Sequence, residues 1–140
     1  LYFAGYTQDA LKEYAEAMIV FALVVDLPLP TPEELDMEPS TYLKGLAEAV
    51  GELRRRIMDI LRGGHSQEAE RLLSEMDEIF NVLVTMDYPD AVTYGLRRQT
   101  DITRGIIERT RGDITLSFRQ HQLEKTNRQA EENILTNHED

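Results

Sequence analysis

The spacing of apolar residues predicts α-helices along most of the chain and gives no strand signal. Between residues 41 and 62 apolar side chains recur every three or four positions, and residues 66–86 repeat the pattern after a serine that can cap a helix. Both segments therefore predict helices with one buried face. The first apolar set is Leu43, Leu46, Val50, Leu53, Ile57, Ile60 and Leu61, and the second is Leu72, Leu73, Met76, Ile79, Phe80, Leu83 and Val84.

The first predicted helix, residues 7–25, carries a different pattern. Its second half, residues 17–25, has no polar side chain, so we expect it to be buried on every side. The apolar run is shorter than the roughly 20 residues that cross a membrane, so no membrane association is expected. Three prolines between residues 28 and 32 end the helix and favour an extended segment.

Two further helices are predicted in the C-terminal part, after a turn at residues 87–90. One covers residues 91–111 and ends at Gly112, and the other covers residues 114–135 and follows Asp113, which can cap it. The second half of that last helix is polar, so it either frays or packs against another subunit. The whole pattern predicts an all-α antiparallel bundle that forms a single domain over residues 1–140, with residues 114–140 as C-terminal helix and tail.

Composition narrows the chemistry that such a bundle can carry. The chain has no cysteine and only three histidines, which excludes thiolate metal sites and gives little support to a histidine-based catalytic triad. Its formal net charge of -11 argues against a protein that coats nucleic acid through a general basic excess. No secretion signal is recognisable, so we expect a cytoplasmic protein. The chain starts at Leu1 without an initiator methionine, so we expect its N-terminal part to be incomplete.

Two pairs of glutamates are the strongest candidates for a functional site. At about 100° of helical turn per residue, Glu13 and Glu16 project from one side of the first helix. Glu48 and Glu52 project in the same way from one side of the second helix. If the two sides face each other, four carboxylates would suit Mg²⁺ or Mn²⁺, which prefer oxygen ligands. Two alternatives stay open: the first pair can be solvated and favour the helix dipole, and Glu52 can form a surface ion pair with a nearby arginine.

Gly45 lies on the same side of the second helix as Glu48 and Glu52. A glycine inside a helix costs about 1 kcal/mol relative to alanine. Its presence indicates that another part of the molecule approaches the helix closely at this level.

Three segments, in order, resemble the translin superfamily, and most closely the branch of translin-associated factor X and its archaeal relatives. They read GYTQDALKEYAEA, YLKGLAEAVGELRR and DYPDAVTYGLRRQTDITRGIIERTRGD, so the resemblance spans residues 5–113. It implies an all-α bundle of the translin type. The helices that precede the EYAEA helix in that family have no counterpart here, in line with an N-terminally incomplete chain.

The resemblance also implies a function. Translin-type proteins assemble into octamer-like shells and bind RNA or single-stranded DNA, and the factor X branch is similar to a metal-dependent endoribonuclease. Carried over by position, its carboxylates fall on Glu13, Glu16, Glu48 and Glu52, although better-known members have aspartate at position 48. We therefore expect a Mg²⁺- or Mn²⁺-dependent endoribonuclease that cleaves RNA in a homo-oligomeric shell. The alternative is a non-catalytic helical assembly protein that binds RNA or single-stranded DNA.

RNA binding requires local positive charge on this acidic protein. The predicted contacts are arginines near the second glutamate pair and on the helix predicted at residues 91–111, because arginine binds phosphate largely independently of base sequence. The alternative for each arginine is that it balances nearby acidic side chains. The candidates are Arg54, Arg55, Arg97, Arg98 and Arg104.

Overall fold

The protein is a bundle of helices packed around the second one. The computed structural model describes residues 2–86 and 90–139, with residues 2–6, 90–94 and 96 described as backbone only. Within this part of the chain all regular structure is helical, which confirms the all-α prediction. The predicted turn at residues 87–90 lies, except for its last residue, outside the described residues. The helices are α1 (Tyr2–Val24), α2 (Pro39–Leu61), α3 (Gln67–Thr85) and α4 (Asp90–Asn137).

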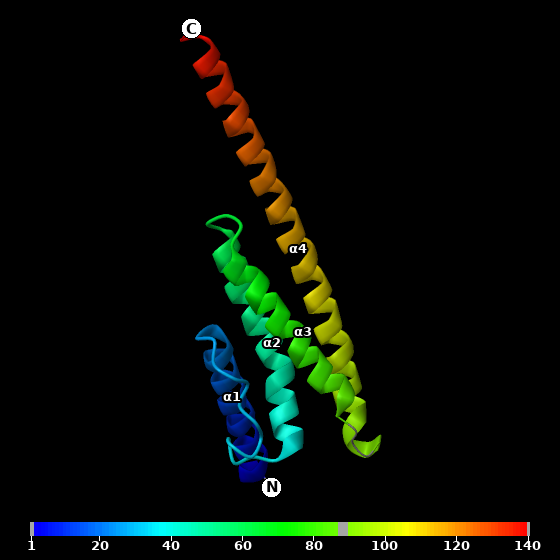
Figure 1. The fold of residues 1–140 in the computed structure, drawn as a ribbon. Helices are drawn as coiled ribbons and strands as arrows, with labels where there is room; N and C mark the ends of the chain where they lie inside the picture. The colour runs from blue at the N-terminus through cyan, green and yellow to red at the C-terminus, as the bar shows by residue number, and fades with distance from the viewer. Residues whose placement is uncertain (1, 87–89, 140) are drawn as a thin grey trace.

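The direction of α1 differs from a fully antiparallel bundle. α1 and α4 lie on opposite sides of the α2–α3 pair, and α2, α3 and α4 alternate in direction as predicted (Figure 1). α1 runs parallel to α2, because the proline-containing segment 25–38, with a turn at residues 32–36, returns along α1 before α2 begins at Pro39. The Tyr42 hydroxyl holds this segment by donating a hydrogen bond of 2.7 Å to the carbonyl oxygen of Pro30. The middle turns of α1 and the first turns of α2 therefore lie side by side.

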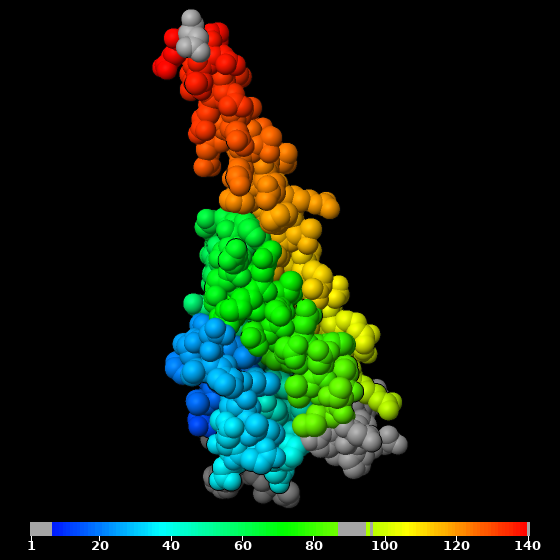
Figure 2. All heavy atoms as spheres, viewed as in Figure 1, coloured from blue at the N-terminus to red at the C-terminus, as the bar shows by residue number. Residues whose placement is uncertain are grey.

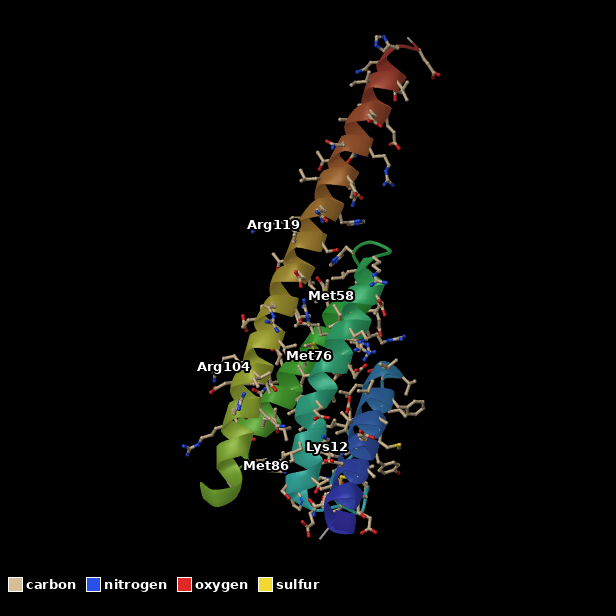
Figure 3. All side chains as sticks on the ribbon, turned by 180° about the vertical axis from the view of Figure 1, so that it is seen from behind. Lys12, Met58, Met76, Met86, Arg104 and Arg119 are labelled. Carbon is tan, nitrogen blue, oxygen red and sulfur yellow. The ribbon has the colours of Figure 1, made fainter. Side chains whose placement is uncertain are left out.

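α2 is the central helix of the core. Its apolar stripe packs against the three other helices, and Leu46, Val50, Leu53 and Ile57 are fully buried. Met76 of α3 is fully buried in the same core (Figure 3). Burying a side chain of this size contributes about 1.5–3 kcal/mol. The core therefore fixes α2 firmly, and with it the side of α2 that faces α1.

α4 corrects the prediction of two C-terminal helices. One helix of 48 residues runs through Gly112, where the sequence predicted one helix to end and a second to follow Asp113. Gly112 does not adopt the positive φ that commonly ends a helix. Buried residues on both sides of it, Ile107 and Ile114, belong to the same core cluster. This continuous burial outweighs the roughly 1 kcal/mol that a glycine costs inside a helix.

The distal part of α4 extends beyond the rest of the bundle (Figure 2). Every residue from 119 to 139 is exposed, and the exposed apolar side chains include Leu123, Ile134 and Leu135. The segment is helical as far as Asn137, so fraying is not seen within the described residues. Packing of this segment against another subunit stays a prediction.

α1 lies at the edge of the bundle, which corrects the expectation that its apolar half is buried on every side. The helix packs mainly on α2, so Ile19 is fully buried while Phe21 and Val25 are about half exposed. Among the described residues, no helix is both long and apolar enough to cross a membrane.

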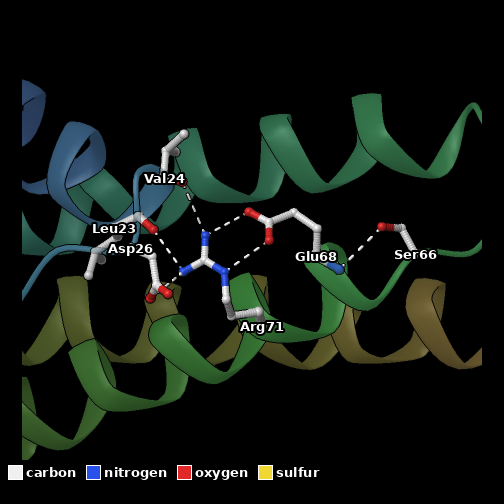
Figure 4. A network of polar contacts seen from close by, with 6 residues as sticks. All are labelled: Leu23, Val24, Asp26, Ser66, Glu68 and Arg71. Atoms are coloured by element: carbon white, nitrogen blue, oxygen red, sulfur yellow. Dashed lines mark hydrogen bonds and ion pairs between the residues drawn. The ribbon is translucent and has the colours of Figure 1, made fainter.

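Arg71 of α3 holds the C-terminal end of α1 (Figure 4). Its guanidinium donates hydrogen bonds of 2.9 Å to the carbonyl oxygen of Leu23 and 3.2 Å to that of Val24. The same group lies 3.3 Å from a carboxylate oxygen of Asp26, and Glu68 accepts two hydrogen bonds of 2.6 and 2.9 Å from it. A cation here satisfies carbonyl groups that lack a partner within the helix and complements the helix dipole. The contact fixes the position of α1 relative to α3.

Candidate active site

Side chains of α1 and α2 form a carboxylate cluster, which consists of Glu16, Glu48 and Glu52. Glu16 lies close enough to Glu48 and Glu52 for both carboxylates to act on its ionisation. The pKa of Glu16 is raised, mainly by burial and then by the hydrogen bond and charge of Glu48. The charge of Glu52 raises it further, while Lys12 opposes the shift. The structure thus brings together three of the four predicted site residues.

Gly45 allows the two helices to meet at this level. A Cβ atom at Gly45 would lie 2.7 Å from the Cβ of Ala15, 3.0 Å from the carbonyl oxygen of Lys12 and 3.2 Å from the amide nitrogen of Glu16. A glycine is required where backbones approach this closely. This is the close approach that the sequence indicated, and it lies about one helical turn before Glu48.

Lys12 neutralises part of the carboxylate cluster. Its ammonium nitrogen lies 3.1 Å from Oε1 of Glu48 and 4.0 Å from Oδ1 of Asp9, and its side chain is only 24% exposed. Figure 3 shows Lys12 where α1 faces α2. The hydrogen bond to Glu48 is the largest cause of the raised pKa of Lys12. The sequence analysis did not select this residue, although its position four residues before Glu16 places both on one side of α1.

A groove of about 610 Å³ runs from the carboxylate cluster along α1 and α2. Glu13 is exposed and lies beside Glu16 at its acidic end. Glu52 lines the groove and pairs with Arg55 at 3.4 Å, so the ion pair that the sequence offered as an alternative for Glu52 is present. The remaining lining residues are Ala17, Val20, Phe21 and Val24 of α1, and Arg56 and Asp59 of α2. The groove thus combines an acidic end, an apolar wall and two arginines.

The donor chemistry of the carboxylate cluster fits a hard divalent cation. Carboxylate oxygens are ligands that Mg²⁺ and Mn²⁺ prefer, and the pKa of Glu16 is raised first by burial and then by the neighbouring carboxylates, both of which a bound cation would counteract. The described residues, however, include no group of three or more histidine, cysteine, aspartate or glutamate side chains that is already arranged to hold a metal ion. Glu48 is paired with Lys12 instead. Metal binding would therefore require side chains of the cluster to rearrange.

Two neighbouring arginines that were predicted to contact RNA have different environments. Arg55 is 75% exposed and lines the groove. Arg54 faces α4, where it donates a hydrogen bond of 3.0 Å to the Thr110 hydroxyl and forms an ion pair of 2.9 Å with Asp113. Asp113 therefore connects α4 to α2 rather than capping a helix. RNA contact by Arg54 stays a prediction that this geometry does not favour.

The other three predicted arginines lie on α4. Arg97, Arg98 and Arg104 are exposed, and the guanidinium of Arg104 lies 5.2 Å from the centre of the Phe80 ring, a distance typical of a cation–π contact. In Figure 3, Arg104 on α4 lies across the bundle from Lys12 on α1. α1 and α4 make no contact in the described part of the chain. A single copy therefore does not gather these arginines beside the groove.

Within its described residues the chain is an all-helical bundle with glutamates where α1 meets α2. No protein-family model matches the chain. An uncharacterised protein of Methanocaldococcus jannaschii is 35% identical over 125 aligned residues, which cover 85% of this chain and 56% of that protein.

Solved C3PO structures share the fold. The complex of AfC3PO with duplex RNA matches at a TM-score of 0.70 and 37% identity, covering 79% of this chain and 58% of that chain. A crystal structure of AfC3PO gives the same TM-score at 34% identity, and apo-NeC3PO gives it at 24%, which supports the fold alone. Since C3PO proteins are of the translin type, these structures confirm the resemblance to the translin superfamily. The chain spans a little over half the length of these relatives.

Proposed function

We propose that this chain is part of a metal-dependent endoribonuclease that cleaves RNA within an oligomeric translin-like shell. The observation that carries the proposal is that Glu16, Glu48 and Glu52 lie close together where α1 meets α2 beside Gly45. The similarity to AfC3PO, which has been solved with duplex RNA, supports RNA as the ligand.

In this proposal Glu13, Glu16, Glu48 and Glu52 provide the oxygen ligands for Mg²⁺ or Mn²⁺. Such an ion, when bound, lowers the pKa of a water molecule and stabilises the oxygen that leaves the phosphodiester. In the alternative arrangement Glu16 is not a ligand and instead accepts a proton from the attacking water as general base, a role that its raised pKa suits. Glu13, at the acidic end of the groove, adds negative charge on the exposed side.

The groove offers a path for an unpaired stretch of RNA beside the carboxylates. Arg55 and Arg56 can bind phosphate, and the apolar wall with the half-exposed Phe21 provides a surface on which a base can stack. The exposed arginines of α4 lie away from this groove. They would contribute to RNA binding in a homo-oligomeric, octamer-like assembly, where α4 of one copy can lie near RNA held by another.

The experiment that tests the proposal is cleavage of labelled single-stranded RNA by the purified protein in Mn²⁺, with and without EDTA. Glu16→Gln and Glu52→Gln remove charge from the cluster with little change in size, and each should lower the cleavage rate about 100-fold or more. Glu78→Gln, on the exposed surface of α3, is the matched control and should cleave like the parent protein. Cleavage that persists in EDTA and in both cluster variants would contradict the proposal.

A second candidate function is RNA or single-stranded DNA binding without cleavage. The pairing of Glu48 with Lys12 and of Glu52 with Arg55 favours it, because both glutamates then have counter-charges within the protein. In that case the protein binds labelled RNA with an affinity that falls steeply with salt concentration, while Mn²⁺ produces no cleavage products. Retained binding in Glu16→Gln would support this alternative only if the parent protein also fails to cleave.

A further inference from the structure

We propose that Lys12 is a built-in competitor of the metal ion: its ammonium occupies Glu48, and a divalent cation has to displace it to bind the carboxylate cluster. The inference rests on the proposed function, because it concerns the same carboxylates. It goes further by assigning to a lysine of α1 the control of metal affinity.

The position of Lys12 is set by backbone as well as by charge. Its carbonyl oxygen lies 3.0 Å from where a Cβ of Gly45 would be, so this turn of α1 is in tight contact with α2. From there the side chain reaches Glu48 at 3.1 Å and stays three-quarters covered. The side chain of Lys12 is therefore fixed beside the carboxylate cluster, unlike that of a fully exposed surface lysine.

The charges of the cluster explain why one ammonium is not enough. The three carboxylates of the cluster share two cations, the ammonium of Lys12 at 3.1 Å from Glu48 and the largely exposed guanidinium of Arg55 at 3.4 Å from Glu52, so the cluster keeps an excess of negative charge. A divalent ion carries twice the charge of the ammonium and binds oxygen ligands directly. The higher charge and the direct coordination therefore favour replacement of Lys12 at Glu48 by the divalent ion, although the existing ion pair has to be broken.

The opposite role for Lys12 makes a different prediction. If the lysine only positioned Glu48 for the metal ion, its removal would weaken metal binding. If it competes, its removal strengthens metal binding. A partly exposed ion pair of this kind corresponds to an affinity change on the order of fivefold.

The experiment is a titration of the full chain with Mn²⁺, in which free Mn²⁺ is measured by electron paramagnetic resonance. Lys12→Met should bind Mn²⁺ on the order of fivefold more tightly than the parent protein. Lys44→Met, which removes the same charge from the exposed side of α2, should leave the affinity unchanged. Lys12→Arg, which keeps the charge, should bind like the parent protein.

A double-mutant cycle separates competition from a structural effect. In a Glu48→Gln background the ion pair is already gone, so Lys12→Met should add a clearly smaller gain in affinity than it does in the parent protein. Unchanged or weaker Mn²⁺ binding in Lys12→Met, with the chain folded as judged by its thermal unfolding, overturns the inference. Should Lys12→Met not fold, Lys12→Gln is measured in its place with the same expected gain.

The outcomes also separate this inference from the proposed function. If the parent protein binds Mn²⁺ and cleaves RNA while Lys12→Met binds no more tightly, only the role of Lys12 is lost. If Lys12→Met binds Mn²⁺ and the parent protein does not, competition by Lys12 is supported. If neither protein binds Mn²⁺, both proposals fail.

Discussion

Gly45 of α2 lies so close to Ala15 of α1 that a Cβ atom on the glycine would be only 2.7 Å from the Cβ of the alanine. The next nearest atoms belong to the α1 backbone, at the carbonyl oxygen of Lys12 and the amide nitrogen of Glu16. Backbone atoms within a helix cannot move independently, so a larger residue here would push α1 away from α2 as a whole. The distance between Glu16 and Glu48 depends on this contact.

Replacing Gly45 with alanine should destabilise the protein even though alanine is the better helix former. Overpacking of this kind costs about 1–3 kcal/mol, against a gain of about 1 kcal/mol in helix propensity. Chemical denaturation measures the change. Gly51→Ala, on the same helix but with no neighbour within 4 Å, is the matched control and should gain about 1 kcal/mol. Equal stabilisation by both substitutions would show that the helices do not meet at Gly45.

Substitutions of Arg54 and Arg55 should have different effects, the first on stability and the second on RNA binding. Arg54→Met breaks the hydrogen bond to Thr110 and the ion pair with Asp113, and should lower the free energy of unfolding by about 1.5–3 kcal/mol. Arg55→Met removes an exposed side chain and should change stability by less than about 0.5 kcal/mol while weakening RNA binding. Denaturation and an RNA-binding titration on both variants check this. A stability loss confined to Arg55→Met would contradict the two roles.

Gly112→Ala tests whether α4 is one helix. A Cβ atom at this position has no neighbour within 4 Å, so alanine should stabilise the protein by about 1 kcal/mol. If the chain instead ended a helix at Gly112 with a left-handed backbone, alanine would destabilise it. The melting temperature distinguishes the two, with a rise of about 2–8 °C expected for a chain of this size.

The Glu68–Arg71 pair should make stability fall at acidic pH. The pKa of Glu68 lies below its usual value of 4.5, mainly because of the hydrogen bond from Arg71. A carboxyl group with a lowered pKa in the folded state stabilises the protein fully above about pH 4.5, and this contribution is lost as pH falls through the folded-state pKa. Glu68→Gln should therefore be less stable than the parent protein at pH 7, with the difference shrinking below pH 4.5. Glu78→Gln is the exposed control, and denaturation curves from pH 7 to pH 3 provide the measurement. A difference that does not depend on pH would rule out this linkage.

The parts of the fold that follow from local periodicity could be predicted from the sequence. The stripes of α2 and α3 are carried by residues three and four apart, and the Ser66 side chain caps α3 by accepting a hydrogen bond of 3.2 Å from the amide of Glu68. The pairing of the glutamates on one side of each helix follows from the same geometry. The close contact at Gly45 was also indicated, since a glycine in mid-helix needs a reason.

The parts that depend on distant partners could not be predicted in this way. Gly112 looked like a helix end by local rules, but burial of Ile107 and Ile114 on one core keeps α4 continuous. The parallel run of α1 and α2 depends on the path of segment 25–38, which has no periodic signal. Lys12 and Arg71 have partners 36 and 45–48 residues away in the sequence, so nothing near them marks their contacts.

Because α4 is one continuous helix, a movement at its exposed end is transmitted along the helix. The 25 residues from Asp113 to Asn137 span roughly 37 Å at 1.5 Å per residue. Near the base of this segment, Asp113 is paired with Arg54, two residues from Glu52 on α2. A partner that displaces the exposed end of α4 would therefore also act on α2, the helix that carries Glu48 and Glu52.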